Sequence, residues 1–111
     1  MPLKESEYVK IRATVPLADA ERVRQAMAKA GAGKQGHYSH CSSSYSSLGR
    51  FTPAVGARPT VGSLGQAEEV PEETIEMLCH RDLVSAVIAA LRAVHPYEEP
   101  AIDILPRLEL E

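Results

Sequence analysis

A chain of 111 residues is the size of one domain, so residues 1–111 are expected to form a single unit. It is 44% hydrophobic but holds one Phe and no Trp, which predicts a mostly aliphatic core. The net charge of −3 offers no basic face for nucleic acid. No apolar run approaches the roughly 20 residues of a bilayer span, and the charged N-terminus lacks a signal-peptide core. These features predict a cytoplasmic protein without nucleic-acid or membrane partners, with Cys41 and Cys79 as reduced thiols.

The first elements in chain order are a strand and a helix. Residues 8–15 alternate, with apolar side chains on one face, which is typical of a half-buried strand. Residues 18–31 carry apolar side chains at helical spacing, and Gly31 is a natural stop. Residues 37–46 are weakly strand-like because serine dilutes them.

The middle of the chain, residues 46–73, holds four Gly and three Pro and is predicted to be a long loop. Loops of this length inside a compact domain are uncommon and tend to be functional. Its acidic positions are predicted to form a solvated face: Glu68, Glu69, Glu72 and Glu73.

Three further elements complete the chain. Residues 74–80 are predicted to form a strand with Ile75, Met77 and Cys79 on one face, residues 81–95 a helix, and residues 101–110 a last strand. The order strand, helix, strand, strand, helix, strand predicts an α+β fold, the ferredoxin-like βαββαβ sandwich. In such a sheet the first and last strands are antiparallel neighbours, so Arg12 or Lys10 is expected to pair with Asp103 on the open face.

Three spaced motifs carry a resemblance: residues 31–42 (GAGKQGHYSHCS), residues 49–78, and residues 95–104 (HPYEEPAIDI). Together they resemble the inserted domain of the GTP cyclohydrolase I type 2 homologues, also called the Ngg-interacting factor three family. The HPYEEP element also resembles CutA, a ferredoxin-like trimer linked to divalent metals, and PII proteins share that architecture. The resemblance implies a stand-alone PII/CutA-like domain with a trimer habit. Because the family's metal ligands lie in flanking halves, it implies no metal site, no cofactor and no hydrolase activity here.

The segment that begins at His95 has two interpretations. His95, Tyr97 and Glu98 could form a ligand-binding set at a subunit boundary, or the segment could be a helix cap followed by a rigid lead-in to a strand. The long loop is similarly open. Arg50 and Arg58 could offer guanidinium groups to an anion, or the loop could be a self-packed flap with Phe51 and Pro53 against a neighbouring subunit.

The cysteines are expected to face the core, Cys79 with Ile75 and Met77, and Cys41 with Tyr45. A copper or zinc site at His40–Cys41 or Cys79–His80 is the alternative, although neighbouring strand residues point apart. The serines at 42–47 have no histidine–carboxylate pair at a spacing that would activate them, so no enzyme is predicted.

The sequence therefore predicts a non-catalytic, homotrimeric binding or regulatory module. Its small-molecule or metal ligand is expected in clefts between subunits, near His95, Tyr97, Glu98, Arg50 and Arg58. The open sheet face, with Tyr8, Leu78 and Leu105, is expected to be buried in the trimer. Two alternatives remain: a copper- or zinc-binding protein of CutA type, and an accessory domain that docks on a metal-dependent hydrolase.

Overall fold

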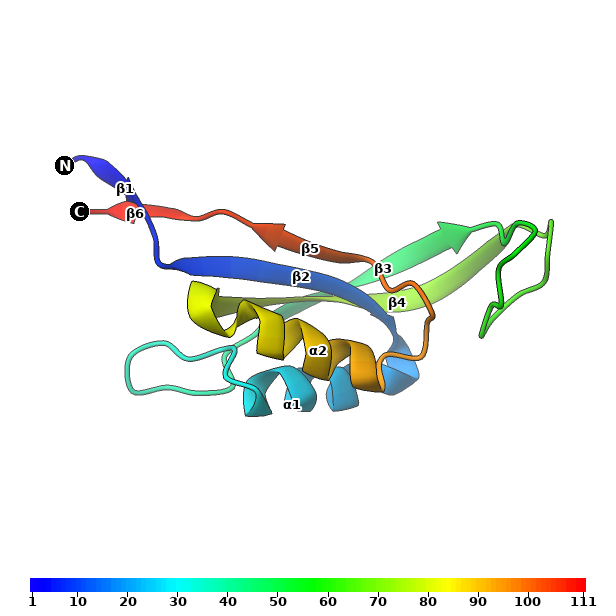
Figure 1. The fold of residues 1–111 in the computed structure, drawn as a ribbon, viewed down its shortest axis with the longest axis horizontal. Helices are drawn as coiled ribbons and strands as arrows, with labels where there is room; N and C mark the ends of the chain where they lie inside the picture. The colour runs from blue at the N-terminus through cyan, green and yellow to red at the C-terminus, as the bar shows by residue number, and fades with distance from the viewer.

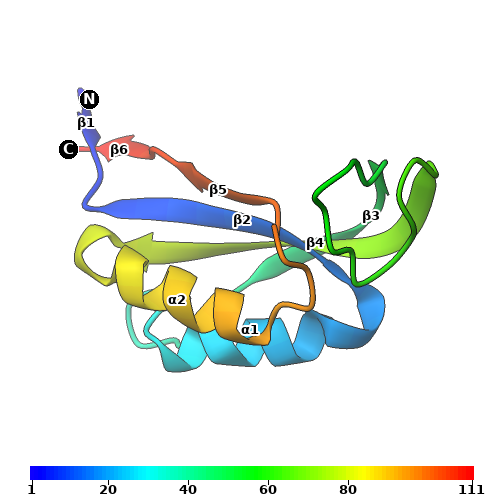
Figure 2. The same cartoon turned by 45° about the vertical axis from the view of Figure 1, so that its right-hand side comes forward.

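The computed structural model describes all of residues 1–111, and its main body is a four-stranded antiparallel sheet with two helices on one face (Figures 1 and 2). The sheet order is β3-β4-β2-β5, which confirms the ferredoxin-like arrangement. The strands are β2 (Tyr8–Pro16), β3 (Ser43–Phe51), β4 (Glu68–His80) and β5 (Ile102–Leu105). The helices are α1 (Ala20–Lys29) and α2 (Val84–Val94), each preceded by a short 3-10 turn, η1 (Leu17–Asp19) and η2 (Arg81–Leu83). No helix has the length and apolar character needed to cross a membrane.

The core lies between the sheet and the two helices, as the alternation of apolar residues predicts. β2 and β4 pair with Ile11 opposite Met77 and Val9 opposite Cys79, so their apolar faces coincide. The helices cover this face with buried side chains at helical spacing: Ala20, Val23 and Met27 from α1, and Val87 and Leu91 from α2. Burying a Val, Leu or Met side chain stabilises the fold by roughly 1.5–3 kcal/mol.

The open face of the sheet carries ion pairs. Arg12 lies opposite Asp103 in the β2–β5 ladder, and its guanidinium donates to Asp103 Oδ2 at 3.1 Å, which confirms the predicted pair. Lys10 instead lies 3.6 Å from Glu76 of β4. Ile104 lies opposite the buried Ile11 but is half exposed, because β5 is a short strand at the edge of the sheet.

The predicted loop 46–73 was too long. β3 runs to Phe51 and β4 begins at Glu68, so the loop spans only residues 52–67. The weak strand expected at 37–46 is shifted and starts at Ser43, because residues 37–42 are irregular and His40 has a left-handed φ of 58°. Beyond Pro16, the last paired residue of β2, the β3–β4 hairpin continues alone and carries the loop at its tip (Figure 1).

Three side chains lie where the sequence did not place them. Glu72, expected in a solvated acidic face, is only 4% exposed because the residues after α2 fold over it. Cys41 precedes β3 and is half buried, and Tyr45 is 51% exposed, so neither is a core residue. Cys79 does face the core, as predicted, and is 1% exposed.

The two ends of the chain form a separate antiparallel ribbon, β1 (Leu3–Glu5) with β6 (Leu108–Leu110). The last predicted strand, 101–110, is therefore two strands, because Pro106 cannot donate to a continuing ladder. The ribbon projects from the sheet at the end opposite the loop (Figure 1), and the molecule measures 51 × 27 × 24 Å.

Candidate ligand site beside the long loop

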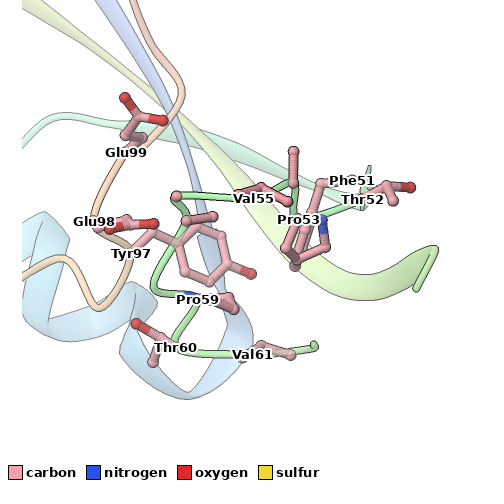
Figure 3. Close-up of a pocket in the computed structure, with 13 residues that line it drawn as sticks. Phe51, Thr52, Pro53, Val55, Pro59, Thr60, Val61, Tyr97, Glu98 and Glu99 are labelled. Carbon is pink, nitrogen blue, oxygen red and sulfur yellow. The ribbon is translucent and has the colours of Figure 1, made fainter. Parts of the chain in front are cut away.

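A cavity lies between the 52–67 loop and the connection from α2 to β5. Residues 51–57, 59–61 and 97–99 line it, and its volume is about 760 Å³. Figure 3 shows Val55, Pro59, Thr60 and Val61 on the loop side and Glu98 and Glu99 on the side of the connection, with the Tyr97 ring between them. The cavity thus brings together two segments about 40 residues apart in the chain, as the hydrogen bond from Arg58 to Glu98 illustrates.

His95 anchors the α2–β5 connection to strand β2. The helix ends there because Pro96 disfavours helical geometry at the preceding residue, and His95 is extended, with ψ of 133°. Its Nε2 lies 2.7 Å from the carbonyl oxygen of Thr14, and its Nδ1 accepts from the Tyr97 amide at 3.1 Å. This pattern assigns the tautomer with the proton on Nε2 and occupies both ring nitrogens. His95 is 7% exposed and acts as a structural link between α2, β2 and Tyr97.

Tyr97 forms one wall of the cavity and is fixed at both ends. Its hydroxyl donates to Glu72 Oε2 at 2.9 Å, and its ring meets Phe51 edge to face at 6.0 Å. Burial, followed by the bond to Glu72, raises the pKa of the Tyr97 hydroxyl well above its usual range. Gly49 makes room for this pair, since a Cβ there would collide with the Glu72 carboxylate.

Hydrogen bonds that each involve a main-chain group fix the position of the 52–67 loop. The Arg58 amide donates to Glu98 Oε1 at 2.8 Å, and Thr60 Oγ1 donates to the Pro96 carbonyl at 2.6 Å. Within the loop, the Gly65 amide donates to the Pro53 carbonyl at 2.7 Å. Phe51 and the buried Pro53 line this cavity within their own chain, and the Phe51 ring meets Tyr97, so one chain forms the walls of the cavity. The contact of Phe51 and Pro53 with a neighbouring subunit stays a prediction.

The five predicted site residues fall into three groups. Tyr97 and Glu98 line the cavity, and Arg58 contributes its backbone amide beside them. His95 lies beneath the wall and does not line the cavity. Arg50 lies elsewhere: strand alternation directs it to the opposite face of the hairpin from Phe51, where it pairs with Glu69 at 2.9 Å.

No sequence pattern indicated that Glu72 and Gly49 support this site. Glu72 stood in an acidic run, and its partner Tyr97 is 25 residues away along the chain. No group of three or more His, Cys, Asp or Glu side chains in the chain is arranged to hold a metal ion.

Comparison with known proteins places this geometry in context. No family model matches the chain. The GTP cyclohydrolase 1 type 2 homologue of Mycobacterium tuberculosis is 48% identical over 90 residues, which cover 81% of this chain and 24% of that protein. The homologue of Bacillus subtilis is 43% identical over 97 residues, 87% of this chain and 26% of that protein. The chain therefore spans about a quarter of the length of these relatives.

Solved structures show the same relationship. A Bacillus cereus protein related to NIF3 matches 96% of this chain with 27% of its own, at 39% identity and a TM-score of 0.79. The periplasmic divalent cation tolerance protein CutA of Archaeoglobus fulgidus matches 90% of this chain with 83% of its own, at 20% identity and a TM-score of 0.66. CutA of Synechococcus elongatus matches at 18% identity and a TM-score of 0.68, over 97% of this chain and 85% of its own. The chain is thus a homologue of one segment, about a quarter in length, of the GTP cyclohydrolase 1 type 2 homologues, and it has the fold of CutA.

Proposed function

We propose that this chain is a PII/CutA-like binding or regulatory module without catalytic activity of its own. It acts as a homotrimer and binds a small ligand in the cavity between the 52–67 loop and residues 97–99. The observation that carries the proposal is that cavity, whose volume of about 760 Å³ is within the range typical of small-molecule sites.

The polar groups of the cavity support binding rather than chemistry. The Tyr97 hydroxyl is committed to the buried Glu72, and one Glu98 oxygen accepts from the Arg58 amide. His95, the side chain best suited to move protons near neutral pH, is buried beneath the wall with both nitrogens bonded. These bonds fix the walls before a ligand arrives, which lowers the ordering cost of binding.

The open face of the sheet supports the trimer. Leu78 and Leu105 are half exposed there, next to the Tyr8 ring, among the ion pairs of Arg12 and Lys10. Such a mixed surface suits an interface in which apolar groups are buried and charges stay paired. A closed ring also ends growth at a fixed number of subunits.

Light scattering on a sizing column tests assembly, and we expect a mass about three times the 12.0 kDa of the chain. Leu78→Asp places a charge on the proposed interface and is expected to give monomers. Leu108→Asp is the control, since Leu108 is exposed on the β1–β6 ribbon and should leave the trimer intact. A wild-type monomer at micromolar concentration would exclude the trimer.

Native mass spectrometry tests the bound species, with the protein examined alone and after addition of copper, zinc or nucleotides. A retained organic molecule supports the proposal. Stoichiometric copper or zinc would instead favour a divalent-metal protein, as the name of the Archaeoglobus CutA suggests for that neighbour. If the protein retains neither an organic molecule nor a metal ion, the results favour the third alternative, an accessory domain. It would dock on a metal-dependent hydrolase equivalent to the remaining three quarters of the relatives.

A further inference from the structure

The charged side chains that line the cavity beside the loop are all negative. Glu98 and Glu99 are the only charged side chains that line it, and no Lys, Arg or His side chain does. Neither carboxylate takes part in a salt bridge. Arg58 donates a hydrogen bond to Glu98 from its backbone amide and makes no salt bridge to it. An incoming phosphate or carboxylate would meet two unneutralised negative charges, whereas a cation would find two partners.

Aromatic rings provide the second attraction. The rings of Phe51 and Tyr97 lie 6.0 Å apart, edge to face, and both line the cavity. The face of an aromatic ring carries negative electrostatic potential, which attracts ammonium and quaternary nitrogen groups within about 6 Å. The Tyr97 hydroxyl donates its proton to the Glu72 carboxylate, and this bond increases the electron density of the ring. Glu72, 4% exposed behind Tyr97, also adds a negative charge on the far side of the wall.

The remaining lining is small and mostly apolar, with Pro53, Val55, Pro59 and Val61 on the loop side (Figure 3). These four side chains suit a hydrocarbon body. Of the two lining threonine hydroxyl groups, that of Thr60 is committed to the Pro96 carbonyl, which leaves Thr52 as the one side-chain donor for a phosphate. We propose that the cavity binds a small organic cation, in which a protonated or quaternary nitrogen is attached to an apolar body. The nitrogen contacts Glu98, Glu99 and the two rings, and the body lies against the loop. This inference rests on the proposed binding function and specifies its ligand class.

A charge series on one apolar body tests this directly. Benzyltrimethylammonium, benzyl alcohol and benzyl phosphate share a benzyl group and differ in charge, and ATP represents the nucleotides. Each is titrated into the intact isotope-labelled protein, and amide chemical shifts report both affinity and location. We expect the cation to bind about tenfold or more tighter than the anion. The perturbed amides should map to residues 51–61 and 97–99.

Paired variants isolate the role of the carboxylates. The double variant Glu98→Gln/Glu99→Gln removes two charges but keeps the acceptor for the Arg58 amide, so the loop remains tied. It should weaken the cation about tenfold and leave benzyl alcohol unchanged. The control Glu5→Gln/Glu111→Gln removes the same charge at the opposite end of the molecule and should leave all affinities unchanged.

Each other outcome is decisive. Tighter binding of benzyl phosphate or ATP at this cavity overturns the cation inference and leaves the binding module standing. Equal loss of cation affinity in both double variants also overturns it, because the effect would then come from net charge alone. If none of the four compounds perturbs these amides, both the cation inference and the proposed binding cavity are wrong.

Discussion

The Tyr97 hydroxyl and the Glu72 carboxylate lie 2.9 Å apart and join the start of the α2–β5 connection to β4, at the residue that pairs with Pro16 at the end of β2. Glu72 is almost fully buried, and the phenol is its hydrogen-bond donor. Because Tyr97 forms one wall of the cavity, this bond links the stability of the fold to the shape of the candidate site.

Tyr97→Phe should destabilise the protein by about 1–3 kcal/mol near neutral pH, because it leaves a buried carboxylate without its donor. Urea denaturation measures this difference. Tyr38→Phe is the control, since Tyr38 is largely exposed and makes no side-chain hydrogen bond of this kind.

The same bond predicts a pH dependence. Folding raises the pKa of Tyr97, so the hydroxyl stays protonated in the folded state at a pH where it ionises in the unfolded chain. Its contribution to stability is therefore complete below the unfolded pKa of about 10 and decreases as the pH rises above it. The stability gap between wild type and Tyr97→Phe should narrow between about pH 9 and pH 11. A gap that is constant over this range would contradict the assignment.

Gly49→Ala should destabilise the protein by about 1–3 kcal/mol, because the new methyl group collides with the Glu72 carboxylate. In a Glu72→Ala background this cost should shrink by about 1 kcal/mol or more, which a double-mutant cycle would reveal. Gly36→Ala provides the comparison. A Cβ at Gly36 meets no other atom, so its cost comes from its left-handed φ of 59° and should add to that of Glu72→Ala.

The sequence predicts an element well where the apolar face in its residue pattern is also the face that is buried in the folded chain. The alternation over residues 8–15 predicts one apolar face for β2, and Ile11 and Ala13 on that face are buried in the core. The antiparallel pairing of the first and last strands predicted that Arg12 or Lys10 pairs with Asp103, and the register of the folded sheet selects Arg12.

The hairpin that bears the site could not be predicted in the same way. β3 is rich in serine and the start of β4 is rich in glutamate, so neither shows the apolar alternation of a half-buried strand. These strands are held by their ladder and by the residues after α2, which are distant in sequence. The acidic run alone predicts a solvated Glu72, because its partner Tyr97 is distant in sequence. The separation of Arg50 from Tyr97 depends on which face of the hairpin each residue occupies, and the sequence does not show this.

The two thiols should react at different rates with a coloured disulfide reagent. Cys79 is buried in the core, and burial raises its thiol pKa, so it should react only when the protein opens. Cys41 is half buried outside the sheet and should react within the native state. Cys41→Ser should remove the fast phase and Cys79→Ser the slow one. Two fast thiols would contradict the position of Cys79.

His95→Ala should destabilise the protein by about 1–3 kcal/mol, because it leaves the Thr14 carbonyl and the Tyr97 amide without partners. The exposed His37→Ala is the matched control and should have little effect. In contrast, His95→Gln should leave any copper or zinc affinity within a few-fold of wild type, since both ring nitrogens are already bonded. A loss of metal affinity of about a hundredfold would instead identify His95 as a ligand.

The pairing of β1 with β6 brings the first and last residues of the chain side by side, with Leu3 opposite Leu110. Adjacent strands are about 4.8 Å apart, so a short glycine linker could join the two ends without stretching the ribbon. New ends could then be opened in the exposed turn at residues 34–40, away from the 52–67 loop. Such a circular permutant should fold and keep its cavity, so reporter domains could be attached at residues 34–40 instead of at the β1–β6 ribbon.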